Sequence, residues 1–217
     1  MKTDHLIEML ARGAGPAPRA VAARRLIPAG AFGVSVSAAL ALALMGPLPQ
    51  EILDTPAPWI KLAYAGLLAL PAGWLAARLA RPVSRPAMPT RLVAAVLLAM
   101  AALGATAWAT TPEADRLGTL FGSSWGACPW NVLALSMPAL AGILWALRGL
   151  APTRPHVAGC AAGLLAGALG AGGYALTCPE TSAVFVAVWY SRPLVVSCGT
   201  QQVRIAGRSR ARWACGQ

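Results

Sequence analysis

The sequence predicts an all-α integral membrane protein, a bundle of six transmembrane helices with the N-terminus in the cytoplasm. The 217 residues are 57% hydrophobic and only 12% charged, a composition outside the range of a soluble domain of this size. The hydrophobic residues also form uncharged runs of about 20 residues, the length of a helix that crosses ~30 Å of hydrocarbon. Basic and acidic loops alternate between these runs, as the positive-inside rule predicts for a multi-pass protein.

Three regions follow from this pattern: a cytoplasmic segment at 1–25, a transmembrane bundle at 26–197, and a polar, basic tail at 198–217. The net charge of +11 would suggest nucleic-acid binding in a soluble protein. Here the basic residues lie between apolar runs, where they set topology. We therefore expect the lipid bilayer as a partner and no direct contact with nucleic acid.

The N-terminal segment contains a predicted amphipathic helix over 3–12. Thr3 is a suitable N-cap, and Leu6, Ile7 and Leu10 line one side at helical spacing. Two interpretations remain open for this helix. It is either a tail on the membrane surface or a docking helix whose apolar stripe is buried by a cytoplasmic partner.

The predicted spans are 26–48, 59–79, 92–109, 129–147, 157–176 and a short, atypical sixth at 182–197. Arg192 and Pro193 interrupt the sixth. Its 16 residues would cover ~24 Å as a helix, which is short for a crossing. We expect it to cross because the basic tail that follows favours the cytoplasmic side.

The distribution of charge sets the orientation. Only two of the eighteen basic residues, Lys61 and Arg116, fall on the predicted outer side. Lys61 lies near the outer end of the second span, where we expect its long side chain to extend to the membrane surface. Five of the seven acidic residues fall on the outer side: Glu51, Asp54, Glu113, Asp115 and Glu180.

Two cysteines lie at similar depth on that outer side. Cys128 begins the fourth span and Cys178 follows the fifth. They can form a disulfide in an oxidising compartment, offer two thiolates to a soft metal ion, or serve only as small packing residues. The sequence contains no C-x-x-C, so zinc-finger spacing is absent.

The fifth span carries glycine at every fourth position, at Gly159, Gly163 and Gly167. Small residues at this spacing let another helix approach closely. The fifth helix is therefore expected at the centre of the bundle.

No catalytic motif appears, and no acid or histidine lies deep in a span. We therefore expect a protein that is not an enzyme and needs no cofactor. Two alternatives stay open: a membrane thiol oxidoreductase, which lacks C-x-x-C here, and a small-solute transporter, which lacks intramembrane polar groups.

Four segments resemble the NrsF-like family of bacterial transmembrane anti-sigma factors: M-K-T-D-H-L-I at the start, G-S-S-W-G-A-C at 122–128, A-P-T-R-P at 151–155 and C-P-E-T-S-A-V-F-V-A-V-W-Y at 178–190. The resemblance covers residues 1–190 and ends where Ser191 begins the polar end of the chain.

The resemblance implies a six-span protein of the bacterial inner membrane that regulates transcription. Its N-terminal segment would hold an extracytoplasmic-function sigma factor inactive on the cytoplasmic side. The resemblance further implies that Cys128 and Cys178 sense oxidative or heavy-metal stress and cause release of the sigma factor.

Overall fold

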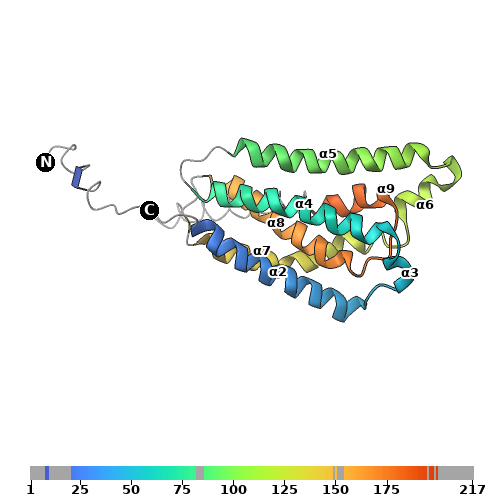
Figure 1. The fold of residues 1–217 in the computed structure, drawn as a ribbon, viewed down its shortest axis with the longest axis horizontal. Coiled ribbons are helices and arrows are strands. Elements are labelled where there is room, and N and C mark those ends of the chain that lie inside the picture. Colours follow the sequence, from blue (N-terminus) through green and yellow to red (C-terminus); the bar gives the residue numbers. More distant parts are fainter. Residues whose placement is uncertain are drawn as a thin grey trace, which may run out of the picture.

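The computed structural model describes residues 8–9, 21–81, 86–148, 150, 154–194, 196–197 and 199. Regular secondary structure in this part of the chain is helical throughout. Five helices in it are long and apolar enough to cross a membrane, and Figure 1 shows them lying lengthwise against one another: α2 (Val21–Met45), α4 (Pro56–Leu79), α5 (Ala87–Thr110), α7 (Cys128–Arg148) and α8 (Pro155–Ala175).

Short elements connect these helices at one end of the bundle, on the right in Figure 1. They are α3 (Gln50–Leu53), η1 (Glu113–Asp115) and α6 (Arg116–Phe121), and the chain returns there again between α8 and α9 (Ala183–Phe185). We call this the acidic end, because the five predicted outer acids lie in these connections. The opposite, basic end carries Arg24, Arg25, Arg78, Arg81, Arg91, Arg148 and Arg154.

The five long helices confirm the first five predicted spans, with shifted ends. α2 begins at Val21, five residues before the predicted start, because Arg24 and Arg25 continue the helix rather than ending it. α2 then ends at Met45, where Gly46 adopts a positive φ of 78° and Pro47 follows. Hydropathy locates the apolar run, whereas glycine and proline locate the helix ends.

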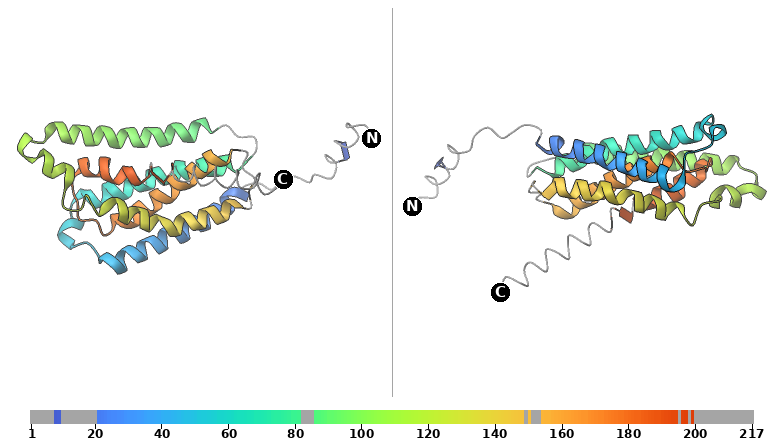
Figure 2. Two further views of the ribbon diagram at one scale, coloured as in Figure 1. Left: turned by 180° about the vertical axis from the view of Figure 1, so that it is seen from behind. Right: turned by 90° about the horizontal axis from the view of Figure 1, so that it is seen from below.

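The helix α8 forms the centre of the bundle. In its most apolar window 78% of the residues are buried, against 17% for α5, so α8 is the core helix and α5 lies at an edge. α8 packs against α2, α4 and α7, while α5 contacts α4 and the segment after α8. Figures 1 and 2 show that α5 and α2 lie at opposite edges of the bundle.

Glycine allows these close approaches. A methyl group on Gly170 would lie 2.7 Å from the Ser136 backbone nitrogen of α7, and one on Gly173 would collide with Ser37 of α2. The three glycines of the predicted ridge, Gly159, Gly163 and Gly167, are all buried in α8. Gly167 faces Leu194, whose Cα would be 3.4 Å from an added methyl.

The chain after α8 runs back along it. α9 continues into a π-helical turn, η2 (Val186–Tyr190), and Ser191 to Leu194 are helical again. The buried Tyr190 hydroxyl donates to the Ala171 carbonyl of α8, and Leu194 lies on Gly167 one turn nearer the basic end. The segment therefore extends from the acidic end into the middle of the bundle, with a π-helical turn that the predicted single helix over 182–197 did not include.

Candidate functional site

Two of the segments singled out in the sequence meet at the acidic end. One Glu180 carboxylate oxygen accepts hydrogen bonds from the backbone N–H groups of Ser123, at 2.7 Å, and Ser124, at 3.0 Å. It also accepts from both serine hydroxyls, at 2.7 and 3.0 Å. Gly122 has a φ of 54°, and a methyl there would lie 2.5 Å from the other carboxylate oxygen. We call this arrangement of 122–124 around Glu180 the serine clamp.

The serine clamp stabilises the charged form of Glu180. Partial burial raises the pKa of this carboxyl, but the four hydrogen bonds from Ser123 and Ser124 outweigh it, so the net pKa lies below its ordinary value. Glu180 is therefore ionised at neutral pH and joins the α6–α7 connection to the α8–α9 connection.

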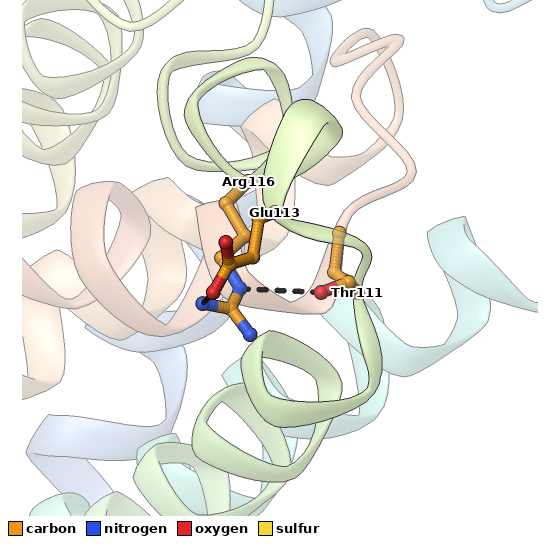
Figure 3. A network of polar contacts seen from close by, with 3 residues as sticks. All are labelled: Thr111, Glu113 and Arg116. Carbon is orange, nitrogen blue, oxygen red and sulfur yellow. Dashed lines mark hydrogen bonds and ion pairs between the residues drawn. The ribbon is translucent and has the colours of Figure 1, made fainter.

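The turn between α5 and α6 has polar contacts of its own. Arg116 donates to the Thr111 carbonyl at 3.2 Å and pairs with Glu113 at 3.4 Å, as Figure 3 shows. At the other end of α6, the Trp189 indole donates to the Leu120 carbonyl at 2.8 Å. These contacts hold α6 between α5 and the segment after α8.

Cys128 and Cys178 lie directly beside each other. Both are free thiols with no solvent-exposed surface, and the Cys128 thiol is hydrogen-bonded to the Cys178 sulfur. Helix ends fix both backbones, since the Cys128 N–H bonds Ser124 at 2.8 Å and the Cys178 N–H bonds Tyr174 at 3.0 Å. The pairing of these two cysteines places a dithiol between α7 and the end of α8.

Lys61 of α4 completes the site. Its ammonium donates to the Cys178 carbonyl at 2.8 Å and also bonds the Cys178 thiol. The prediction that Lys61 extends to the membrane surface is wrong, because its side chain has no exposed surface. α4 packs along α8, and in this arrangement the buried ammonium of Lys61 is hydrogen-bonded to the carbonyl and thiol of Cys178.

The surroundings of Cys178 favour its thiolate. The hydrogen bond from Cys128 lowers the pKa of the Cys178 thiol, and burial opposes this effect. Lys61 and the Glu180 backbone N–H lower the pKa further, so that it lies below its ordinary value. A thiolate is the nucleophilic form of cysteine. The contacts from Lys61 and the Glu180 N–H therefore favour the thiolate at Cys178, with the Cys128 thiol as its hydrogen-bonding neighbour.

Two tyrosines connect the dithiol to the rest of the bundle. Tyr174 hydrogen-bonds Asn131 of α7 and Cys178, and the Tyr190 ring stacks on it with centroids 6.1 Å apart. Tyr190 belongs to the segment after α8, which also bonds α4 through Ser191 and Tyr64 at 2.8 Å. Through Lys61 and these tyrosines, the two thiols are connected to α4, α7 and η2. A change at the thiols can therefore reach all three elements.

Sequence reasoning identified the two cysteines but not Lys61, Tyr174, Tyr190 or the serine clamp. Of these residues, Lys61 could have been identified from the sequence, because a single charge inside an apolar span is by default a functional-site candidate. Within the described residues, no group of three or more His, Cys, Asp or Glu side chains is placed to hold a metal ion. The predicted docking residues Thr3, Leu6, Ile7 and Leu10 lie outside the described residues.

Comparison with known proteins gives the family. A family model described as "NrsF: Negative regulator of sigma F" matches residues 10–213. The chain belongs to the NrsF family. This match extends well past Tyr190, so the prediction that the resemblance ends there is wrong, and the polar end is part of the family's sequence.

Two relatives of the chain carry names of the same kind. The "Probable anti-sigma-F factor NrsF" of Azospira oryzae is 35% identical over 216 residues, which cover 98% of this chain and all of that protein. The "Anti-sigma-F factor NrsF" of Caulobacter vibrioides is 41% identical over 196 residues, covering 88% of this chain and 91% of the relative. No solved structure matches the chain.

Proposed function

We propose that this NrsF-family protein is a membrane-bound anti-sigma factor that sequesters an extracytoplasmic-function sigma factor on the cytoplasmic side of the bacterial inner membrane. The observation that carries the proposal is the alignment over most of its length with two relatives named anti-sigma-F factors. Five helices able to span a bilayer support membrane attachment. The proposal excludes catalysis and direct contact with nucleic acid.

The orientation in the proposal follows from charge. All seven described arginines of the basic end lie beside helix termini on that side of the bundle, which would place it in the cytoplasm under the positive-inside rule. α2 begins at this end, so the segment before it would also be cytoplasmic. The serine clamp and the dithiol would then face the oxidising compartment.

The sixth crossing is part of the same proposal. Tyr190 bonded to Ala171 and Leu194 lying on Gly167 support a segment that continues toward the basic end. A reporter fused after Gln217 should therefore be cytoplasmic. An alkaline phosphatase fusion at that position should be inactive and a green fluorescent protein fusion should be bright. An active phosphatase there would place the tail outside and contradict the crossing.

The partner-binding element in the proposal is the apolar stripe of the N-terminal segment, formed by Leu6, Ile7 and Leu10 after the Thr3 cap. Such a stripe binds by inserting its anchors into a groove of the partner. We expect Leu6→Asp with Leu10→Asp to release the sigma factor while leaving the protein in the membrane. Each lost anchor costs on the order of 2 kcal/mol or more, so sigma-dependent transcription should rise to the level of a deletion strain.

The matched control places two aspartates on the other side of the same helix, as His5→Asp with Arg12→Asp. These positions lie close together at 3.6 residues per turn and away from the stripe. The control should keep repression. Repression that survives in the Leu6 and Leu10 double variant, at normal membrane abundance, would exclude the stripe as the docking surface.

The inducing event in the proposal is a change at Cys128 and Cys178. A hydroperoxide would be attacked by the Cys178 thiolate, which gives a sulfenic acid and releases the hydroxyl or alkoxyl group as water or alcohol. The Cys128 sulfur then attacks the sulfenic sulfur, a second water leaves, and a disulfide forms. The dithiol loses two electrons and the peroxide gains them. A soft metal ion would instead bind both sulfurs as thiolates, and the Cys128 thiol would lose its proton.

Either product would strain the same contacts. The bonds from Lys61 and the Glu180 N–H are made to the Cys178 sulfur as it stands, and a disulfide or metal thiolate removes its negative charge. Tyr174, Tyr190 and Lys61 would then repack, and these residues belong to α8, η2 and α4. In this proposal the repacking lowers the affinity of the basic end for the sigma factor.

A further inference from the structure

A groove of about 800 Å³ lies at the basic end, between α2 and α7. Arg24 and Arg25 of α2 and Arg148 of α7 stand at its rim, and all three are exposed. The structure places no acidic partner on any of them within the described residues. Three unpaired guanidinium groups around one opening form a site for an anion, since each offers a planar fork of donors that matches phosphate.

The walls of the groove are apolar. Phe32 is 62% exposed and Trp145 73% exposed, and both line the groove with Pro28. Phe32 lies seven residues beyond Arg25, which is ~10 Å along the helix. The charged rim therefore lies at the end of the bundle and the apolar walls lie further along the helices. The headgroup and acyl regions of a bilayer follow each other in the same order.

The floor of the groove is made by small residues. Ala29 of α2 and Gly142 of α7 line it, and a methyl on Gly142 would lie 3.5 Å from the Ala29 carbonyl oxygen. Because the helices meet through side chains this small, the flanking aromatic rings leave a furrow between them. A furrow of this kind fits a hydrocarbon chain.

We infer that this groove binds one anionic phospholipid, with its phosphate on Arg24, Arg25 and Arg148 and an acyl chain between Phe32 and Trp145. The charge of the rim selects an anion, and basic pockets between transmembrane helices hold acidic headgroups in this way. The exposed apolar walls select a lipid over an acidic protein segment, because the walls lie on α2 and α7 at the depth of the hydrocarbon, where a charged peptide would be costly.

The test is lipid retention by the full-length protein in detergent, measured by native mass spectrometry with phosphatidylglycerol and, separately, phosphatidylcholine. The wild-type protein should retain phosphatidylglycerol preferentially. R24Q/R25Q/R148Q should lose that preference by tenfold or more, since each arginine near an acidic headgroup contributes roughly fivefold. The control R78Q/R81Q/R91Q removes three arginines of the same end but outside the groove, and it should keep the preference.

A second variant keeps every charge. Gly142→Leu places its Cβ in ordinary contact with Ala29 and fills the furrow, so phosphatidylglycerol retention should fall while helical content by circular dichroism stays the same. Inorganic phosphate at millimolar concentration should not displace the lipid. Displacement by phosphate alone would show a simple anion site instead.

Other results would overturn the inference. Equal losses in both triple-arginine variants would reduce the effect to general positive charge. Retained lipid in R24Q/R25Q/R148Q, together with lost repression of sigma-dependent transcription, would make the groove a protein-docking surface. Lost lipid with intact repression would support the lipid site and leave the proposed anti-sigma function untouched.

Discussion

Replacing either Cys128 or Cys178 with serine is expected to abolish induction of sigma-dependent transcription by hydroperoxide or by a thiophilic metal ion such as Cd²⁺. The two thiols are hydrogen-bonded to each other and have no exposed surface, so neither can form the intramolecular product without its partner. Induced and uninduced states differing by ~1–3 kcal/mol would change the affinity for the partner 5–150-fold. Each single variant should lose this change in affinity completely, so that its sigma-dependent transcription is the same with and without the inducer.

The double variant should behave like either single one, because both changes remove the same bond. Thr177→Ser is the matched control, since it alters the residue next to Cys178 without touching the dithiol and should induce normally. Transcription is measured with a reporter, and membrane abundance by immunoblot. Normal induction in Cys128→Ser or Cys178→Ser would make the pair a packing contact and nothing more.

The second large effect is expected from Lys61→Met. Lys61 bonds both the carbonyl and the thiol of Cys178, and methionine replaces it with an apolar side chain of similar length. With the ammonium gone, the pKa of the Cys178 thiol should rise, because Lys61 is one of the groups that lower it. The midpoint of the thiolate ultraviolet absorbance, measured against pH as the difference from the Cys178→Ser variant, should then move up, and induction should need more oxidant.

Lys61→Arg is the control that keeps the charge, and its thiolate-absorbance midpoint should stay close to that of the wild type. The pH profile separates this role from a structural one, because poor packing alone changes how much protein folds but not the midpoint. The Cys178 carbonyl loses its donor in Lys61→Met, which costs ~1–3 kcal/mol of stability, so the assay uses protein that remains in the membrane. An unchanged midpoint in Lys61→Met would remove Lys61 from the site.

The five long helices could be predicted because their main determinant is local. An uncharged run such as 157–176 is long enough to cross a bilayer whatever surrounds it, and α8 begins and ends within two residues of it. The central position of α8 also followed from the sequence, since its glycines and alanines allow close contact. The helix ends shifted where proline and glycine, rather than charge, decide them, as at Gly46.

The candidate site was predictable only in part. Cys128 and Cys178 could be placed at one depth from topology, but their contact depends on how far α7 and α8 rotate about their axes. The rotation of α4 about its own axis decides whether Lys61 points to the membrane surface or to Cys178. Apolar residues lie on every side of α4, so its sequence does not fix that rotation. The serine clamp depends on the positive φ of Gly122 and on a contact between residues 57 positions apart.

Hydrogen bonds between helices could not be predicted from the sequence pattern either. Tyr190 lies within an apolar run, and its bond to the Ala171 carbonyl requires the π-helical turn of η2. Pattern analysis assumes 3.6 residues per turn, so a π turn changes which residues face α8. The tertiary contacts of this segment therefore had to come from the structure.

The most direct measurement for the central proposal is co-purification of a sigma factor with the affinity-tagged, full-length protein extracted from its own membranes in detergent. The eluate is analysed by mass spectrometry before and after hydroperoxide treatment on the resin. We predict that one sigma factor of the extracytoplasmic-function class is retained by the reduced protein, is released when Cys128 and Cys178 join, and stays bound to the Cys178→Ser variant under the same treatment. A reduced, folded protein that retains no sigma factor would contradict the proposed function.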